Sequence, residues 1–289
     1  MLNVVLLIPD ALACCKNVRS LYLSLVLNEF GYSIVDPNMP HKVASDAAKM
    51  RKRGMIQLCT TVDAWSPEAQ KYDIGRKCLE AILEQSDWTV RILTKNAAIV
   101  NDFDLIEKYK DRVLVGLTLT GTPSKTDVIS AIEPNASPLH ERFEAMRQAH
   151  RLGLRTYAML CPIMPGIADG QSEINELVRF AKEIGAEEIF AEAINGRGPG
   201  LKNTENSLRE AGFEEEARSV GAIRKTKNWS PYAADLIQKL QRSISRYGMD
   251  GKLRYLLYPK NLNDADRNRI RKNDAGVVWL GEEKANVAA

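Results

Sequence analysis

The sequence predicts an α/β fold with parallel strands, and the clearest signals lie in the region 54–166. Short apolar segments rich in β-branched residues end in polar residues at 55–61, 90–95 and 113–120, and a fourth runs from Thr156 to Cys161. Helical patterns separate these segments. Strands alternating with helices of this length form parallel β-α units with right-handed crossovers. Because chemistry in such folds collects at the carboxyl ends of the strands, we expect the site among the polar residues that follow them.

The length of 289 residues allows one α/β barrel-like domain, or one domain with an appendage. We predict three regions, namely an atypical N-terminal part at 1–53, a barrel core at 54–200 and a C-terminal helical and strand extension at 201–289. The core strands are almost continuously apolar, which is typical of parallel strands buried on both faces. One curved sheet with outer helices should therefore contain the segments 55–60, 90–94, 113–119, 155–161 and 188–194.

The N-terminal part reads as a strand at Leu2–Ile8, a loop containing Cys14 and Cys15, and a helix at 17–30 that Gly31 ends as a C-cap. In the core, Ser66 followed by Pro67 predicts the start of a helix that runs to Ser86. The remaining helices are predicted at 102–109, 137–153, 172–184, 204–223 and 230–247, and two last strands at 253–258 and 276–280.

Five cysteines occur without the spacing of a disulfide scaffold, which favours a reducing, cytoplasmic location. The apolar run Val4–Ile8 is too short to cross a bilayer and lacks the features of a signal peptide. We therefore expect no membrane partner.

Charge is unevenly distributed along a chain whose net charge is +3, since residues 218–272 contain 14 Lys and Arg against 4 Asp. This basic region is interleaved with Trp229, Tyr232, Tyr247, Tyr255 and Tyr258, a combination that indicates a nucleic-acid face. The alternative is a solvated basic helix face whose aromatic side chains point into the core.

Six segments together carry a resemblance to a known family, at 92–96, 117–120, 132–142, 190–198, 256–259 and 276–281. The most specific of them is the Glu-Pro-x-x-Ser-Pro stretch that begins at Glu133. Over roughly 54–281 the chain resembles the radical S-adenosylmethionine (SAM) superfamily, and within it proteins similar to spore photoproduct lyase.

The resemblance implies a partial parallel (β/α)6 barrel with SAM lying across the strand ends. It also implies a 4Fe-4S cluster held by three cysteines in a Cys-x3-Cys-x2-Cys loop, since thiolates suit iron–sulfur clusters. An electron donor such as ferredoxin or flavodoxin would then drive reductive cleavage of SAM to a 5′-deoxyadenosyl radical. The cofactor supplies this chemistry, while the protein positions and shields it.

The sequence departs from that pattern in the loop that should hold the cluster. Counting from Cys14 places Val18 and Leu21 at the other two ligand positions, and counting from Cys15 also yields a single cysteine. Three explanations are open. The start of the chain is altered, the protein has lost the cluster and kept the scaffold, or Cys14 and Cys15 recruit a cluster together with distant thiols such as Cys59 or Cys161.

Family positions that contact SAM match several residues at the strand ends. Lys95 and Thr118 match positions that contact the SAM carboxylate or ribose, and a lysine can pair with a carboxylate as a point charge. Asp63 is a candidate for the SAM amino group, and Glu192 and Asn195 for the adenine side, with structural loop roles as the alternative. Cys161 is a candidate hydrogen-atom relay, or else an inert core thiol.

The function that the sequence favours is a radical SAM protein that acts on an unknown substrate, with a nucleic-acid base as one candidate. The incomplete cysteine motif raises the prospect that this version is inactive. The alternative is a cluster-free module that binds SAM, a nucleotide or nucleic acid on the same scaffold.

Overall fold

The computed structural model describes residues 35–50, 54–59, 63–196 and 199–281, together with the backbone of two dipeptides at 26–27 and 32–33. The predicted strand Leu2–Ile8 and the candidate cluster ligands Cys14 and Cys15 lie outside the described residues. The chain divides into two compact units. Unit 1 takes its described residues from positions up to 117, from 135–137 and from 144–156, and unit 2 comprises 118–134, 138–143 and the described residues from 157 onward.

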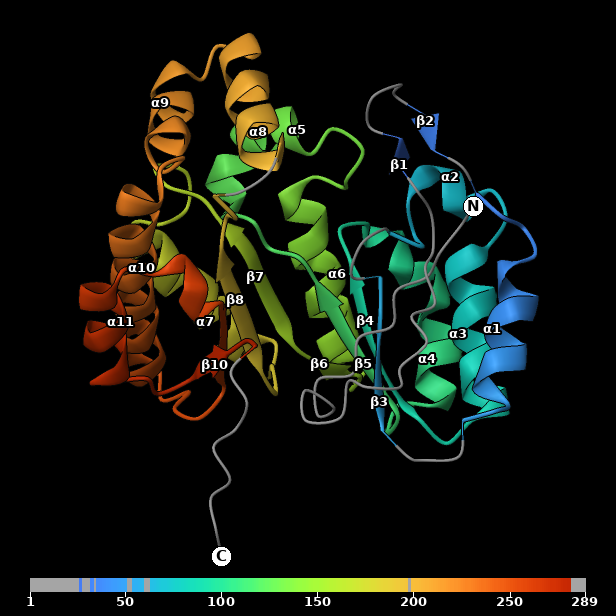
Figure 1. The fold of residues 1–289 in the computed structure, drawn as a ribbon. Coiled ribbons are helices and arrows are strands. Elements are labelled where there is room, and N and C mark those ends of the chain that lie inside the picture. Colours follow the sequence, from blue (N-terminus) through green and yellow to red (C-terminus); the bar gives the residue numbers. More distant parts are fainter. Residues whose placement is uncertain are drawn as a thin grey trace, which may run out of the picture. The chain divides into compact units, whose positions relative to one another are not determined.

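Unit 1 contains a four-stranded sheet in the order β3-β4-β5-β6, and every neighbouring pair is parallel (Figure 1). The strands are β3 (Met55–Leu58), β4 (Thr89–Thr94), β5 (Val113–Leu117) and β6 (Arg155–Thr156). Their buried positions include five β-branched apolar residues, Ile56, Val90, Ile92, Val113 and Val115, which suit a pleated sheet covered by helices. The predicted parallel β-α arrangement is confirmed for these strands.

The other elements of unit 1 depart from the sequence prediction in two places. Ser66 caps the first turn as predicted, since its hydroxyl accepts a hydrogen bond from the Ala69 amide at 3.3 Å. The helix then breaks at Asp73, whose φ of 53° is left-handed, so that α2 (Pro67–Gln70) and α3 (Ile74–Gln85) are separate. The helix predicted at 17–30 is wrong at its end, because β1 (Val26–Leu27) pairs antiparallel with β2 (Tyr32–Ser33). The remaining elements are α1 (Met39–Ala47), η2 (Ala97–Asp102), α4 (Phe103–Lys108) and the second part of α6 (Leu139–Arg151).

Unit 2 contains a second parallel four-stranded sheet, in the order β10-β9-β8-β7. Its strands are β7 (Ala158–Ile163), β8 (Ile189–Ala193), β9 (Leu253–Leu257) and β10 (Val277–Trp279). The sequence predicts a single strand at 155–161, whereas β6 and β7 belong to different sheets and are separated by the buried Tyr157. The two C-terminal strands, which the sequence assigns to an extension, pair with the sheet through β8.

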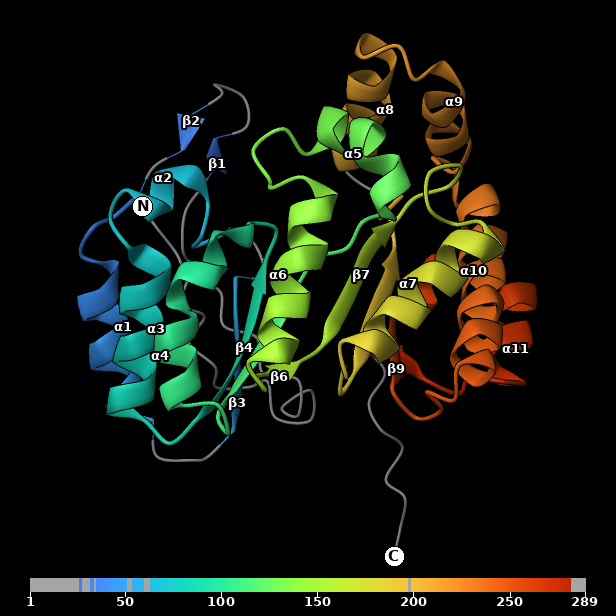
Figure 2. The same cartoon turned by 180° about the vertical axis from the view of Figure 1, so that it is seen from behind.

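Helices cover one face of the unit 2 sheet, where α7 (Gln171–Glu183), α10 (Thr226–Arg246) and α11 (Asp264–Arg271) lie beside one another (Figure 2). The helix predicted at 204–223 is two helices, α8 (Pro199–Glu210) and α9 (Glu214–Ala222), because Gly212 turns the chain with a φ of 85°. The other elements are η3 (Pro123–Lys125), α5 (Thr126–Ile132) and η4 (Pro259–Asn261). Among the described residues, no helix has the length and hydropathy needed to span a membrane.

Candidate functional site

The carboxyl end of β4 in unit 1 is organised by the carboxylate of Asp63. The carboxylate accepts hydrogen bonds from the Thr94 hydroxyl at 2.7 Å, the Lys95 amide at 2.8 Å, the Asn96 side-chain amide at 2.9 Å and the Trp65 amide at 2.9 Å. A carboxylate offers about four lone-pair sites, so these four donors occupy them all. Asp63 therefore orients the Thr94–Asn96 turn.

The turn at Lys95 is also held from the Glu-Pro-x-x-Ser-Pro stretch. The Ser137 amide donates to the Lys95 carbonyl at 3.1 Å, and the Ser137 hydroxyl accepts from the Ala97 amide at 2.9 Å. The sequence predicts a helix from residue 137, whereas α6 begins at Leu139 and Ser137 serves this turn. The Lys95 side chain is half-buried. A fixed backbone presents this cation at a strand end, where an anionic group of a ligand could meet it.

In unit 2 the segment after β5 is fixed by a buried ion pair. Arg142, whose side chain is 1% exposed, donates to the Thr118 carbonyl at 3.1 Å and to Glu133 Oε2 at 2.7 Å. The same Glu133 oxygen accepts from the Thr120 hydroxyl at 3.2 Å. Beyond β5, Thr118 bridges Met159 of β7, and the Leu119 amide donates to the Met159 carbonyl at 2.8 Å. Among the described residues, the Thr118 hydroxyl has no hydrogen-bond partner and stays available to a ligand.

Cys161 of β7 and Glu192 of β8 form a thiol–carboxyl pair in unit 2. The Cys161 Sγ donates to Glu192 Oε2 at 3.7 Å. Both side chains are half-buried. They lie on the opposite face of the sheet from the fully buried side chains of Leu160, Ala191 and Tyr255. Burial raises the pKa of the Glu192 carboxyl, and the Cys161 thiol only partly opposes that shift. The sheet thus brings together two of the predicted site residues.

Asn195 lies beyond the end of β8 and is exposed. It lines a cavity of about 20 Å³, the volume of a single water. The other lining residues come from three separate segments of unit 2, namely Gly196, Arg224, Thr226, Trp229 and Asn261. The cavity is too small for adenine, so within unit 2 Asn195 could contribute to a ligand site only at its rim.

The described cysteines do not fit a three-thiolate iron–sulfur cluster. Cys78 lies in α3, is 2% exposed, and burial raises its pKa to about 12. Cys59 directly follows β3 with a φ of 67°, so it lies at the strand end and not in mid-strand as the sequence predicts. Burial, with the nearby charge of Asp63, raises the pKa of the Cys59 thiol. In the part of the chain that the structure describes, no three His, Cys, Asp or Glu side chains form a metal-binding group.

The aromatic side chains of the basic region divide between core and surface. Tyr255 and Trp229 are buried, and Trp229 donates its indole N–H to the Ile194 carbonyl at 2.7 Å. Burial also raises the pKa of the Tyr232 hydroxyl. The core alternative is therefore correct for Trp229 and Tyr255, whereas Tyr232 is half-buried and Tyr258 is exposed.

Glu133, Ser137 and Arg142 are the residues that reasoning from the sequence did not identify as parts of a site. All three belong to the stretch that carries the family resemblance, which was the available signal. Their roles could not be read from that stretch, because Arg142 contacts Thr118, 24 positions away, Ser137 contacts Ala97, 40 positions away, and Glu133 contacts Thr120, 13 positions away.

Comparison with curated proteins finds two uncharacterised relatives. The chain is 27% identical over 182 residues to the uncharacterised protein ORF301 of Acidianus two-tailed virus, covering 62% of this chain and 59% of that protein. It is 26% identical over 147 residues to the uncharacterised protein MJ0683 of Methanocaldococcus jannaschii, covering 51% of this chain and 53% of that protein. The chain thus matches only part of either relative, and no family model matches it.

Comparison with solved structures identifies the fold. A spore photoproduct lyase variant with bound AdoMet and dinucleoside spore photoproduct matches with a TM-score of 0.54 at 14% identity, covering 76% of this chain and 67% of that chain. Spore photoproduct lyase complexed with dinucleoside spore photoproduct matches with a TM-score of 0.50, also at 14% identity and with the same coverage. The chain therefore has a fold similar to that of spore photoproduct lyase, which agrees with the α/β fold that its sequence predicts.

Proposed function

We propose that this chain binds SAM at the carboxyl ends of its parallel strands and takes nucleic acid as its macromolecular partner. The observation that carries the proposal is the fold match to a spore photoproduct lyase with bound AdoMet, combined with a lysine held on a fixed turn at a strand end. In open parallel α/β sheets, ligands bind beyond the carboxyl ends of the strands.

One polar group of unit 1 supplies the contact that we propose for SAM. The Lys95 ammonium pairs with the SAM carboxylate. Asp63 acts on Lys95 through the backbone, because its carboxylate is fully occupied by Trp65, Thr94, Lys95 and Asn96. Asp63 is a positioning residue that keeps the Lys95 donor aimed where a ligand arrives.

The proposal stops at SAM binding and does not extend to radical chemistry. A 4Fe-4S cluster would supply the electron that cleaves SAM, and three thiolates would have to hold it. The five cysteines of the sequence contain no Cys-x3-Cys-x2-Cys motif, and the Cys78 thiol is buried in a helix. Since these residues do not fit the cluster, we favour the cluster-free binding module over an active radical enzyme.

Equilibrium dialysis with labelled SAM tests the proposal. Lys95→Ala should weaken binding about tenfold or more, because a hydrogen bond to a charged group contributes about 1.5–3 kcal/mol. Lys77→Ala is the matched control in the same unit, since Lys77 is an exposed lysine on α3. Equal SAM affinity for wild type and Lys95→Ala would show that the site lies elsewhere. Equal losses in both lysine variants would indicate a general charge effect.

A further inference from the structure

Tyr258 stands out among the aromatic residues of the basic region because its side chain is 42% exposed. Only Tyr72 and Leu152 are also exposed among the large hydrophobic side chains that the structure describes. A single exposed aromatic side chain is normal on a protein surface and needs no explanation. The surroundings of Tyr258 are what set it apart.

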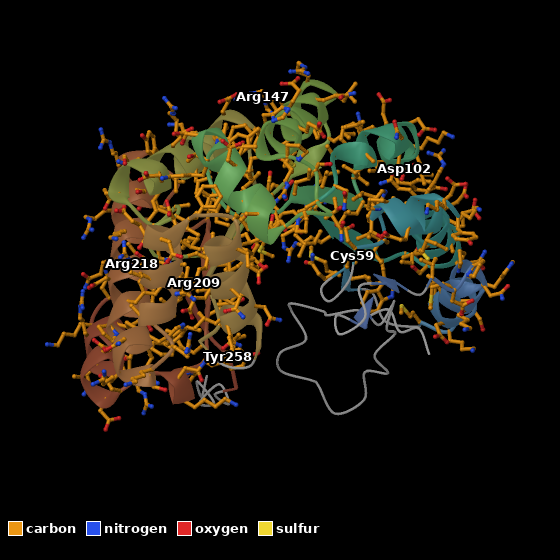
Figure 3. All side chains as sticks on the ribbon, turned by 90° about the horizontal axis from the view of Figure 1, so that it is seen from above. Cys59, Asp102, Arg147, Arg209, Arg218 and Tyr258 are labelled. Atoms are coloured by element: carbon orange, nitrogen blue, oxygen red, sulfur yellow. The ribbon has the colours of Figure 1, made fainter. Side chains whose placement is uncertain are left out.

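Tyr258 immediately follows β9, at the carboxyl end of the unit 2 sheet (Figure 3). The Lys260 ammonium lies 5.7 Å from the centroid of its ring. On the neighbouring strand β10, Trp279 pairs in register with Leu257, and the Arg271 guanidinium lies 4.6 Å from the Trp279 ring. The ends of two adjacent strands therefore each carry an aromatic ring with a cation against it.

The charge beside the Tyr258 ring is positive, whereas the Trp279 indole N–H donates to the Asp274 carboxylate at 3.2 Å. Among the described residues, the Lys260 ammonium has no carboxylate partner, in contrast to Arg254 and Arg269, which pair with Glu188 and Asp235. An exposed π-face beside a cation without a carboxylate partner matches what a nucleotide offers, namely a planar base and a phosphate. Proteins that bind single strands combine stacking aromatics and backbone-tracking cations in this way.

We propose that the ends of β9 and β10 form a stacking site for single-stranded nucleic acid, with a base on the Tyr258 ring and a phosphate on Lys260. The inference rests on the proposed function, because it specifies how the nucleic-acid partner is recognised. Within the basic region, the inference places the nucleic-acid contacts at the carboxyl end of the unit 2 sheet.

The test measures binding of two fluorescent oligonucleotides of equal length, an oligothymidylate and an abasic strand with the same phosphates. Tyr258→Ala should weaken binding to oligothymidylate about tenfold, the equivalent of ~1.4 kcal/mol and within the range for one stacked base. It should leave binding to the abasic strand unchanged. Tyr258→Phe should retain the affinity of the wild type, and Tyr72→Ala is the matched control at an exposed tyrosine of unit 1.

Lys260→Gln should weaken binding to both strands equally. The slope of log affinity against log salt concentration should fall by about 0.7, as expected for one lost phosphate contact on a single strand. Equal losses for Tyr258→Ala on both strands, or no loss on either, would overturn the stacking site. SAM binding is measured on the same samples. If the wild-type protein binds SAM but no oligonucleotide, the stacking site and the nucleic-acid part of the proposed function are wrong, and the SAM site stands. If the wild-type protein binds oligonucleotide but no SAM, the SAM site is wrong, and the stacking site stands.

Discussion

Breaking the buried Arg142–Glu133 pair should be among the most destabilising single changes in unit 2. The Arg142 and Glu133 side chains are 1% and 12% exposed, and their atoms Nη2 and Oε2 are 2.7 Å apart. Arg142→Met fills similar volume but leaves the Glu133 carboxylate in a low-dielectric site with the Thr120 hydroxyl as a remaining donor. It also removes the donor of the Thr118 carbonyl.

Removing one partner of a buried ion pair costs about 3–5 kcal/mol, mainly because the other charge stays buried and uncompensated. Domains are stable by about 5–15 kcal/mol, so the loss should be readily visible. Urea unfolding followed by circular dichroism should show a lower midpoint with an unchanged slope. The double variant Glu133→Gln/Arg142→Met should recover a large part of the loss, because it leaves no buried charge behind.

Arg151→Ala is the matched control on the same helix. Arg151 and Glu144 lie 2.6 Å apart, but their side chains are 59% and 58% exposed, so their pairing is screened by solvent. We expect no measurable change in stability for this variant. An Arg142→Met midpoint equal to that of Arg151→Ala would refute the reasoning, as would a double variant that loses the sum of both single effects.

Two further predictions concern the cofactor and the thiol–carboxyl pair. After anaerobic reconstitution, iron and sulfide analysis of the unaltered chain should give far fewer than four irons per chain. The double variant Val18→Cys/Leu21→Cys should raise that number if the cluster motif is counted from Cys14. A full cluster in the unaltered chain would restore the radical-enzyme hypothesis. Burial raises the pKa of Glu192, so the folded state binds this proton more tightly than the unfolded state, and stability falls as pH rises from the usual carboxyl pKa toward the raised one. Glu192→Gln should therefore raise the melting temperature at pH 7 relative to wild type and change it little near pH 4, and an equal shift at both values would contradict the raised pKa.

The sequence by itself determined most of the core strands and the kind of fold, because short apolar segments alternating with amphipathic helices allow few arrangements other than parallel β-α units. It also located the polar strand ends. The run Thr94-Lys95-Asn96 ends an apolar strand, and that local pattern is sufficient to predict a turn at the carboxyl edge. The missing cysteine motif is likewise a property of the sequence alone.

Only the tertiary structure decided what each polar group does. Asp63 is a ligand candidate in the sequence, yet its four hydrogen bonds come from residues up to 33 positions away and make it a support for Lys95. The same holds for Arg142, whose partner Thr118 is 24 positions distant. Tyr255 and Tyr258 are three residues apart in one basic segment, but strand alternation buries the first, while the second lies beyond the end of β9 and is exposed. Local patterns fix secondary structure, whereas hydrogen-bond partners and exposure depend on contacts that form only when distant segments pack together.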